Sequence, residues 1–151
     1  MRVAVTLAAL ALMAITSACG GSDDGNGTRL VLTDDGCTYE GEETVSTGSF
    51  TADVENKTDY FGAFAVAAVA EGTTIDRLVA YMENARQQFG ESGTLPDPPQ
   101  IYSQIVRVGV NAGSASKLPA DVEPGTYALT CFVDDLPTWK PYVATRLEVT
   151  G

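Results

Sequence analysis

The 151-residue sequence contains no histidine. Without an imidazole, the chain cannot build a histidine-ligated zinc site, and it cannot carry out Ser-His-Asp or Cys-His nucleophilic catalysis. Basic residues are also scarce, since 9 Lys and Arg stand against 20 Asp and Glu, for a net charge of −11. So acidic a surface repels nucleic acid and anionic lipid headgroups, and we expect no nucleic-acid partner.

The N-terminal residues have the pattern of an export signal. Arg2 is a short positive region, and residues 3–15 are apolar but too few to span a membrane in the mature protein. Small residues then precede Cys19, in the stretch Ile15-Thr16-Ser17-Ala18-Cys19, which resembles the lipobox of bacterial lipoproteins. The resemblance implies cleavage before Cys19 and lipid on its sulfur, so that the mature chain is anchored to the extracytoplasmic face of the cell membrane. The alternative is an ordinary secretory signal that ends near a cysteine.

Cysteine is rare as well, with three in the sequence. If lipid occupies Cys19, an even pair remains, Cys37 and Cys131. An exported chain meets an oxidising environment, which favours a disulfide between them. Such a bond would close a loop of nearly the whole domain and contribute about 4–5 kcal/mol. The alternative is two separate buried thiols.

Three segments follow from this pattern: a signal peptide over residues 1–18, a lipidated cysteine and flexible spacer over 19–28, and one domain over 29–151. Cleavage removes Arg2, which leaves 8 basic and 20 acidic residues and a mature net charge of −12. Strands are predicted where short segments alternate or are uniformly apolar, over 30–32, 37–41, 48–56, 60–70, 101–110, 125–133 and 142–149.

One helix is predicted between the strands. Thr73 or Thr74 can cap its N-terminus, and Gly90 can end it. Its apolar residues recur at spacings of three, four and seven, and they are Ile75, Leu78, Val79, Met82 and Phe89. We interpret this stripe as the face that packs on the strands.

Several stretches, taken in order, resemble a cupredoxin-like domain of secreted bacterial proteins. They are CTYEG, VENKTD, EGTTIDRLVAYM, LPADVEPGTYALTCFV and the closing RLEVTG, and together they cover roughly residues 30–150. The resemblance implies an all-β fold, a cupredoxin-like Greek-key β-sandwich of about seven strands with one inserted α-helix. It also places Cys131 at the end of a core strand and Cys37 just after the first strand, where the two sulfurs can approach each other.

The same resemblance raises the question of copper. In the family, a cysteine at the position of Cys131 ligates copper together with two imidazoles and a weak axial ligand such as methionine. The two segments where the family carries its histidines, 56–62 and 132–140, contain none here. The one methionine of the mature chain, Met82, belongs to the helical stripe. We therefore expect no copper and no other cofactor.

Two groups of residues remain as candidate sites. Asp34-Asp35 and Asp134-Asp135 flank the two cysteines, so four carboxylates near one end of the sandwich could hold calcium. The alternative is two solvated turns, because aspartate favours turns. Trp139 and Tyr142, with Asp134 and Asp135, form a candidate binding loop. The alternative for Trp139 is that it folds down and plugs the end of the sandwich.

The expected function is therefore non-catalytic. We expect a lipid-anchored binding or surface domain without copper, whose partners are the membrane and an unidentified protein or small-molecule ligand. One alternative is a carboxylate-based calcium carrier or an enzyme. Another is a degenerate relative of a copper carrier that still docks the carrier's partner.

Overall fold

The computed structural model describes residues 27–94, 97 and 100–151. The predicted signal peptide, Cys19 and most of the predicted spacer lie outside these residues, so the structure does not test them. Within the described ranges, no helix is both long and apolar enough to cross a membrane.

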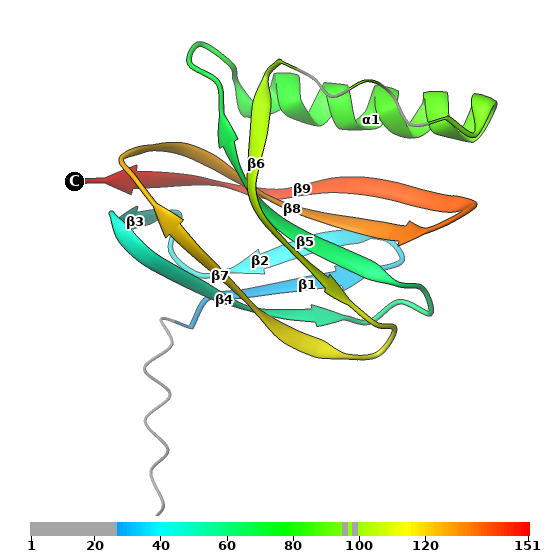
Figure 1. Cartoon of the computed structure of the whole chain (residues 1–151), viewed down its shortest axis with the longest axis horizontal. Helices are drawn as coiled ribbons and strands as arrows, with labels where there is room; N and C mark the ends of the chain where they lie inside the picture. The colour runs from blue at the N-terminus through cyan, green and yellow to red at the C-terminus, as the bar shows by residue number, and fades with distance from the viewer. Residues whose placement is uncertain (1–26, 95–96, 98–99) are drawn as a thin grey trace, which may run out of the picture.

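Two β-sheets stack face to face (Figure 1). The four-stranded sheet contains, in spatial order, β2 (Gly36–Glu40), β1 (Arg29–Thr33), β4 (Gly48–Asn56) and β7 (Ala115–Val122). The five-stranded sheet contains β3 (Thr44–Ser46), β9 (Thr138–Thr150), β8 (Gly125–Asp135), β5 (Gly62–Val69) and β6 (Tyr102–Val110). Two pairs are parallel, β1 with β4 and β3 with β9, and the other ladders are antiparallel. The predicted all-β sandwich is confirmed.

The core fills the space between the sheets, and strand alternation explains how. On β4, Phe50, Ala52 and Val54 are buried, whereas Thr51 and Asp53 between them are exposed. Side chains on a strand point to alternate faces, so this strand gives one face to the core and one to water. The predicted alternation of the segment 48–56 is confirmed, with the same bounds.

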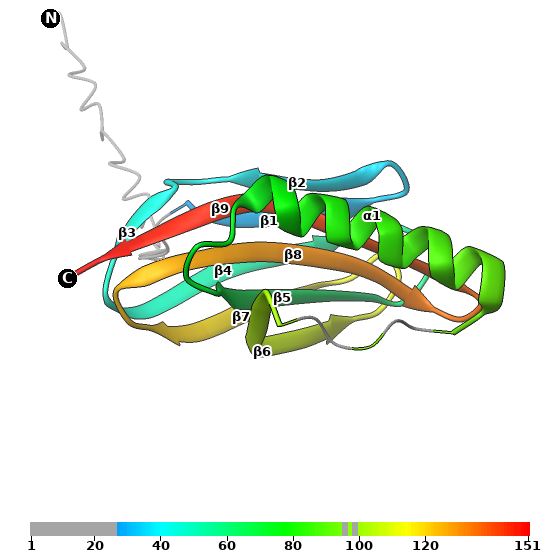
Figure 2. The same cartoon turned by 90° about the horizontal axis from the view of Figure 1, so that it is seen from above.

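The helix α1 (Ile75–Ser92) covers the outer face of the five-stranded sheet, as Figure 2 shows from above. Thr74 caps it by accepting a hydrogen bond from the Arg77 N–H at 3.2 Å. Leu78 and Met82 face the sheet, where they pack in one apolar cluster on alanines and a phenylalanine: Ala63, Ala65, Ala128 and Phe132. Small side chains under the helix let it approach closely, so β5 is buried on both faces over its first six residues.

Four expected boundaries are wrong. The helix passes through Gly90 and ends at Gly93, whose φ of 66° is a left-handed conformation that glycine adopts without steric cost. The segment between the predicted strands 101–110 and 125–133 contains the strand β7, and the short strand β3 was not expected either. The last strand begins at Thr138 rather than Tyr142, because β8 and β9 form a hairpin with a tight turn. The described residues therefore contain nine strands, not about seven.

A disulfide joins the two sheets. Cys37 lies on β2 and Cys131 on β8, with Cα atoms 5.9 Å apart, inside the usual range for a disulfide. The predicted bond is confirmed. Cys131 is fully buried in the core, whereas Cys37 is half-buried at its margin.

Candidate functional site

The predicted calcium site does not assemble. Asp34 and Asp35 lie in the turn between β1 and β2, and Asp134 forms an ion pair with Arg107 of β6. Across the described part of the chain, no three acidic, cysteine or histidine side chains gather where they could hold a metal ion. Asp135 is exposed at the end of β8.

The predicted binding loop is a hairpin of regular strands. Trp139 lies on β9 and packs against Phe89 of the helix, with ring centroids 5.6 Å apart. The tryptophan thus belongs to the apolar cluster between the helix and the sheet, which corrects its expected place in a loop. It neither projects from a loop tip nor plugs the end of the sandwich.

Tyr142 lies on the opposite face of β9 from Trp139. It packs against the core between the sheets, and its strand partner is Cys131. Its hydroxyl donates to the backbone carbonyl of Asp34 at 3.4 Å. Burial raises the pKa of the Tyr142 phenol, opposed by the nearby Arg86 guanidinium. Because β9 separates the two aromatic rings, Trp139 and Tyr142 do not form one surface.

The end of the sandwich where the cupredoxin resemblance places a copper ligand carries an asparagine network instead. Asn56 is fully buried at the end of β4. Its Nδ2 donates to the carbonyls of Tyr60 at 2.8 Å and Val110 at 3.0 Å. Its Oδ1 accepts from the N–H of Thr58 at 3.1 Å and from its hydroxyl at 2.8 Å. A buried amide with all its hydrogen bonds satisfied rigidifies this end of the fold.

This network packs tightly against β5. A Cβ built on Gly62 would lie 2.8 Å from Asn56 Nδ2 and 2.8 Å from Leu32 Cδ2, so the backbone of β5 touches the amide directly. The one cysteine at the family's ligand position is bonded to Cys37. The residues present therefore do not fit a type 1 copper centre, which requires a thiolate and two imidazoles.

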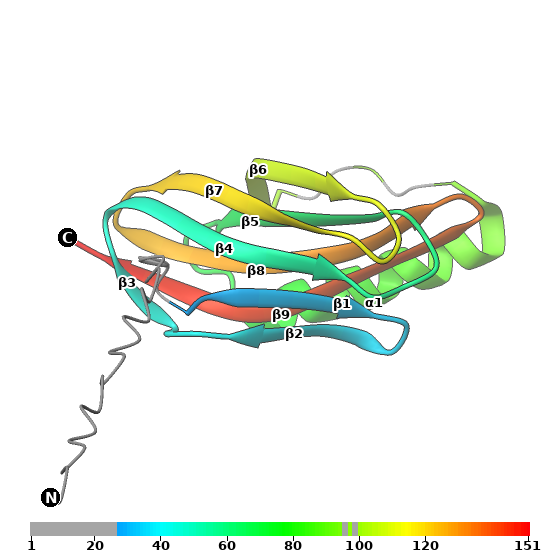
Figure 3. The same cartoon turned by 90° about the horizontal axis from the view of Figure 1, so that it is seen from below.

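A hydroxyl-rich groove lies beside β3, next to Thr28 near the start of the described residues. Figures 1 and 3 show that β3 and the C-terminus lie at one end of the sandwich. The groove has a volume of about 560 Å³. Seven of its ten lining residues carry a hydroxyl, and the full set is Thr28, Glu42, Thr44, Val45, Ser46, Thr47, Ser49, Phe50, Thr51 and Thr150. Pockets for small ligands are usually of this size, so we take the hydroxyl-rich groove as the candidate site.

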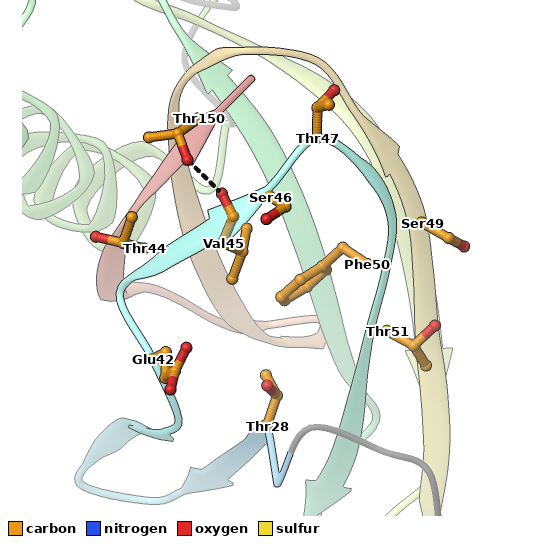
Figure 4. Close-up of a pocket in the computed structure, with 10 residues that line it drawn as sticks. All are labelled: Thr28, Glu42, Thr44, Val45, Ser46, Thr47, Ser49, Phe50, Thr51 and Thr150. Atoms are coloured by element: carbon orange, nitrogen blue, oxygen red, sulfur yellow. Dashed lines mark hydrogen bonds between the residues drawn. The ribbon is translucent and has the colours of Figure 1, made fainter.

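The path of the chain builds this groove. The residues after β2 cross to the five-stranded sheet as β3, and Gly48 then returns the chain to the four-stranded sheet as β4. Gly48 adopts a φ of 118°, a conformation that L side chains rarely take. In Figure 4, Val45, Ser46 and Phe50 point toward the middle of the groove and Thr44 lies beside it, whereas Ser49 and Thr51 point away from it on the other side of β4.

Sequence reasoning missed this site. Most of the residues that form it lie in the segment 42–51, where half of the residues carry a hydroxyl and most of the others are acidic or small, a composition typical of a surface loop. Thr28 and Thr150 lie more than a hundred residues apart in the chain and meet only in the folded structure. The one signal available was the density of Ser and Thr between Glu43 and Thr51.

The sheet order and the inserted helix define an all-β sandwich of two sheets with one helix on its outer face. No family model matches the sequence, and no curated protein matches it. Several solved structures are similar to it at low identity. Auracyanin from Roseiflexus castenholzii is 15% identical, over 82% of this chain and 95% of its own, with a TM-score of 0.44. Auracyanin A from Chloroflexus aurantiacus is 13% identical, over 81% and 96%, with a TM-score of 0.45.

A larger protein is also similar. A multicopper oxidase from Pediococcus acidilactici is 12% identical over 99% of this chain but only 30% of its own length, with a TM-score of 0.42. Similarities this distant carry no argument about what this chain binds or does.

Proposed function

We propose that the chain is a membrane-anchored, extracytoplasmic lipoprotein whose sandwich domain acts by binding, without copper and without catalysis. Lipid on Cys19 would hold the domain at the membrane surface, and the polar spacer would separate the two.

The disulfide between Cys37 and Cys131 carries this proposal. It supports export, because disulfides persist in oxidising compartments. It also removes the thiolate that a copper centre of this fold would need, while the sequence supplies no imidazole. A domain without these ligands has no means to carry an electron through type 1 copper, which favours a binding role.

Copper binding can be tested on the mature protein in detergent. Titration with Cu(II), with the disulfide intact, should give no intense blue absorption, and a type 1 copper protein measured alongside provides the positive control. The titration should then be repeated after reduction, because free thiolates alone bind copper without the spectrum of a type 1 site. A strong blue absorption in the unreduced protein would overturn the copper-free assignment.

Anchoring can be tested in a bacterial host that processes lipoproteins. The wild-type chain should incorporate a fatty-acid probe and partition into detergent, and Cys19→Ala should remain unprocessed or be released. Ser22→Ala, in the spacer, is the matched control and should behave like the wild type. If Cys19→Ala is processed, labelled and membrane-bound as before, the proposed anchor is wrong.

A further inference from the structure

We propose that the hydroxyl-rich groove binds a neutral saccharide. This inference rests on the proposed function as a binding domain, and it names the class of ligand. The argument follows from the hydrogen-bonding groups in the groove, its charge, its exposed backbone and its shape.

The groove offers hydroxyls that are not used within the protein. Among the described residues, the side chains of Thr44 and Ser46 on β3 make no hydrogen bond or ion pair, and neither do those of Ser49 and Thr51, which lie on the face of β4 opposite Phe50. Each of these side chains is exposed, so a ligand can reach it. A hydroxyl both donates and accepts, which matches the hydroxyls of a sugar in either direction.

The charge of the groove excludes anionic ligands. Glu42 is its one charged residue, and no Lys or Arg lines it. A phosphate or carboxylate ligand would therefore meet a like charge and no cation, in a mature chain whose formal charge is −12. A single carboxylate can still accept hydrogen bonds from a neutral polyol.

The free edge of β3 adds backbone groups to the groove. β3 pairs with β9 on one side only. The Glu148 N–H donates to the Glu43 carbonyl at 2.7 Å, and the Thr47 N–H donates to the Thr150 carbonyl at 2.8 Å. Because a parallel ladder uses alternate residues of a strand, the backbone groups of Thr44 and Ser46 point to the side that β9 leaves open.

The shape of the groove suits a small ring rather than a long chain. Half-buried Val45 gives the groove a small apolar contact, against which a C–H group of a sugar ring can lie, above Phe50, which is itself buried in the core (Figure 4). β3 has three residues, so a peptide added to its edge would find very few ladder hydrogen bonds. A compact neutral polyol uses both this apolar contact and the surrounding hydroxyls.

Two sources can supply this chemistry, a soluble or wall polysaccharide and the headgroup of a neutral glycolipid. Thr28 lines the groove and lies nine residues after Cys19. Nine extended residues reach at most about 30 Å, so in the anchored protein the groove would lie within about 30 Å of the lipid anchor. Both a polysaccharide and a glycolipid headgroup could then reach the groove.

Backbone amide NMR of the mature protein, in a zwitterionic detergent without a sugar headgroup, tests the proposal. The probes are maltotriose, cellotriose and mannotriose, each titrated to about 10 mM, above the millimolar range of weak specific binding. Flotation with phosphatidylcholine vesicles, with and without digalactosyl diacylglycerol, tests the glycolipid source on the delipidated Cys19→Ala protein. Inorganic phosphate, spermidine and an alternating threonine-valine hexapeptide are the competing ligand classes.

We expect saturable shifts of the amides in segment 42–51 with at least one trisaccharide, or glycolipid-dependent flotation. Ser46→Leu fills the groove and should abolish binding. Ser46→Ala removes one hydroxyl and should weaken binding about 2- to 10-fold. Ser103→Ala, on the exposed face of β6, is the matched control and should bind like the wild type.

Three results would overturn the inference. The first is that neither the trisaccharides nor the glycolipid has any effect. The second is that phosphate, spermidine or the peptide shifts the amide signals and the sugars do not. The third is that a folded Ser46→Leu protein binds as well as the wild type. None of these results bears on the lipid anchor or on the outcome of the copper titration. Loss of the saccharide site would therefore leave the proposed function standing, and failure of the anchor would leave the groove result intact.

Discussion

Reducing the Cys37–Cys131 disulfide should lower the stability of the domain strongly. The bond joins residues 94 positions apart, and it links β2 of one sheet to β8 of the other. Chain-entropy arguments give about 4.7 kcal/mol for a closed loop near 100 residues. For a domain of this size, such a loss corresponds to a fall in the melting temperature of about 15–25 °C.

The burial of the two sulfurs decides which substitutions test this. Cys131 is fully buried, so a serine there would add the cost of a buried hydroxyl, whereas Cys37 is half-buried. We therefore do not expect Cys37→Ser and Cys131→Ser to have equal effects on stability. Alanine avoids this difference, so Cys37→Ala, Cys131→Ala and the double variant should melt within a few degrees of one another, because they remove the same bond.

Circular dichroism melts with and without a dithiol reductant measure the effect, and mass spectrometry of the alkylated, non-reduced protein counts free thiols. Asn111→Ala, on the exposed connection between β6 and β7, is a control that should change little. Alkylation of both Cys37 and Cys131 without reduction would refute the reasoning. So would effects of the two alanine substitutions that simply add in the double variant.

Three further outcomes follow from the structure. Asn56→Ala should destabilise the domain by about 3 kcal/mol in urea unfolding, because the Val110 carbonyl and the Thr58 N–H lose their partner on the Asn56 side chain, whereas an effect below about 1 kcal/mol would contradict the role of the network. Phe89→Ala should red-shift the fluorescence of Trp139, the one tryptophan, and an unchanged spectrum would mean that the helix does not cover it. Stability should fall above about pH 10, because burial raises the pKa of several phenols in the folded state, so the folded chain binds more protons there than the unfolded chain. The phenols with a raised pKa are those of Tyr39, Tyr81, Tyr102 and Tyr142. Absorbance titration should show that they ionise at higher pH in the folded protein than in urea. Titration curves that coincide in the two states would contradict this prediction.

Much of the sandwich can be predicted from local pattern. The segment 48–56 alternates so regularly that its bounds agree with β4, and Leu78 and Met82 mark the buried face of the helix. The sequence pattern gives a wrong prediction where the composition of a segment is atypical of the structure it adopts. β7 carries Lys117 and Pro119, which suggest a loop, yet Leu118, Ala120 and Val122 still alternate into the core. Pairing with β4 outweighs the weak local preference of the segment.

The candidate site could not be predicted from the sequence, for a different reason. Trp139 stands between two prolines, which favoured a loop, but pairing with β8 makes the segment a strand and turns the ring toward the helix. The hydroxyl-rich groove depends on the crossing of β3 between sheets, a three-residue strand that no periodicity can reveal. Both errors come from long-range pairing, which local composition does not encode.

The disulfide also determines how the domain would respond to mechanical force. A pull through the residues before β1 loads a strand held on both sides, antiparallel to β2 and parallel to β4. If that strand peels away, extension reaches Cys37 and stops, because the covalent link carries the tension to Cys131. The load then bypasses the intervening 93 residues, which cannot be drawn out from this end unless the bond is first reduced.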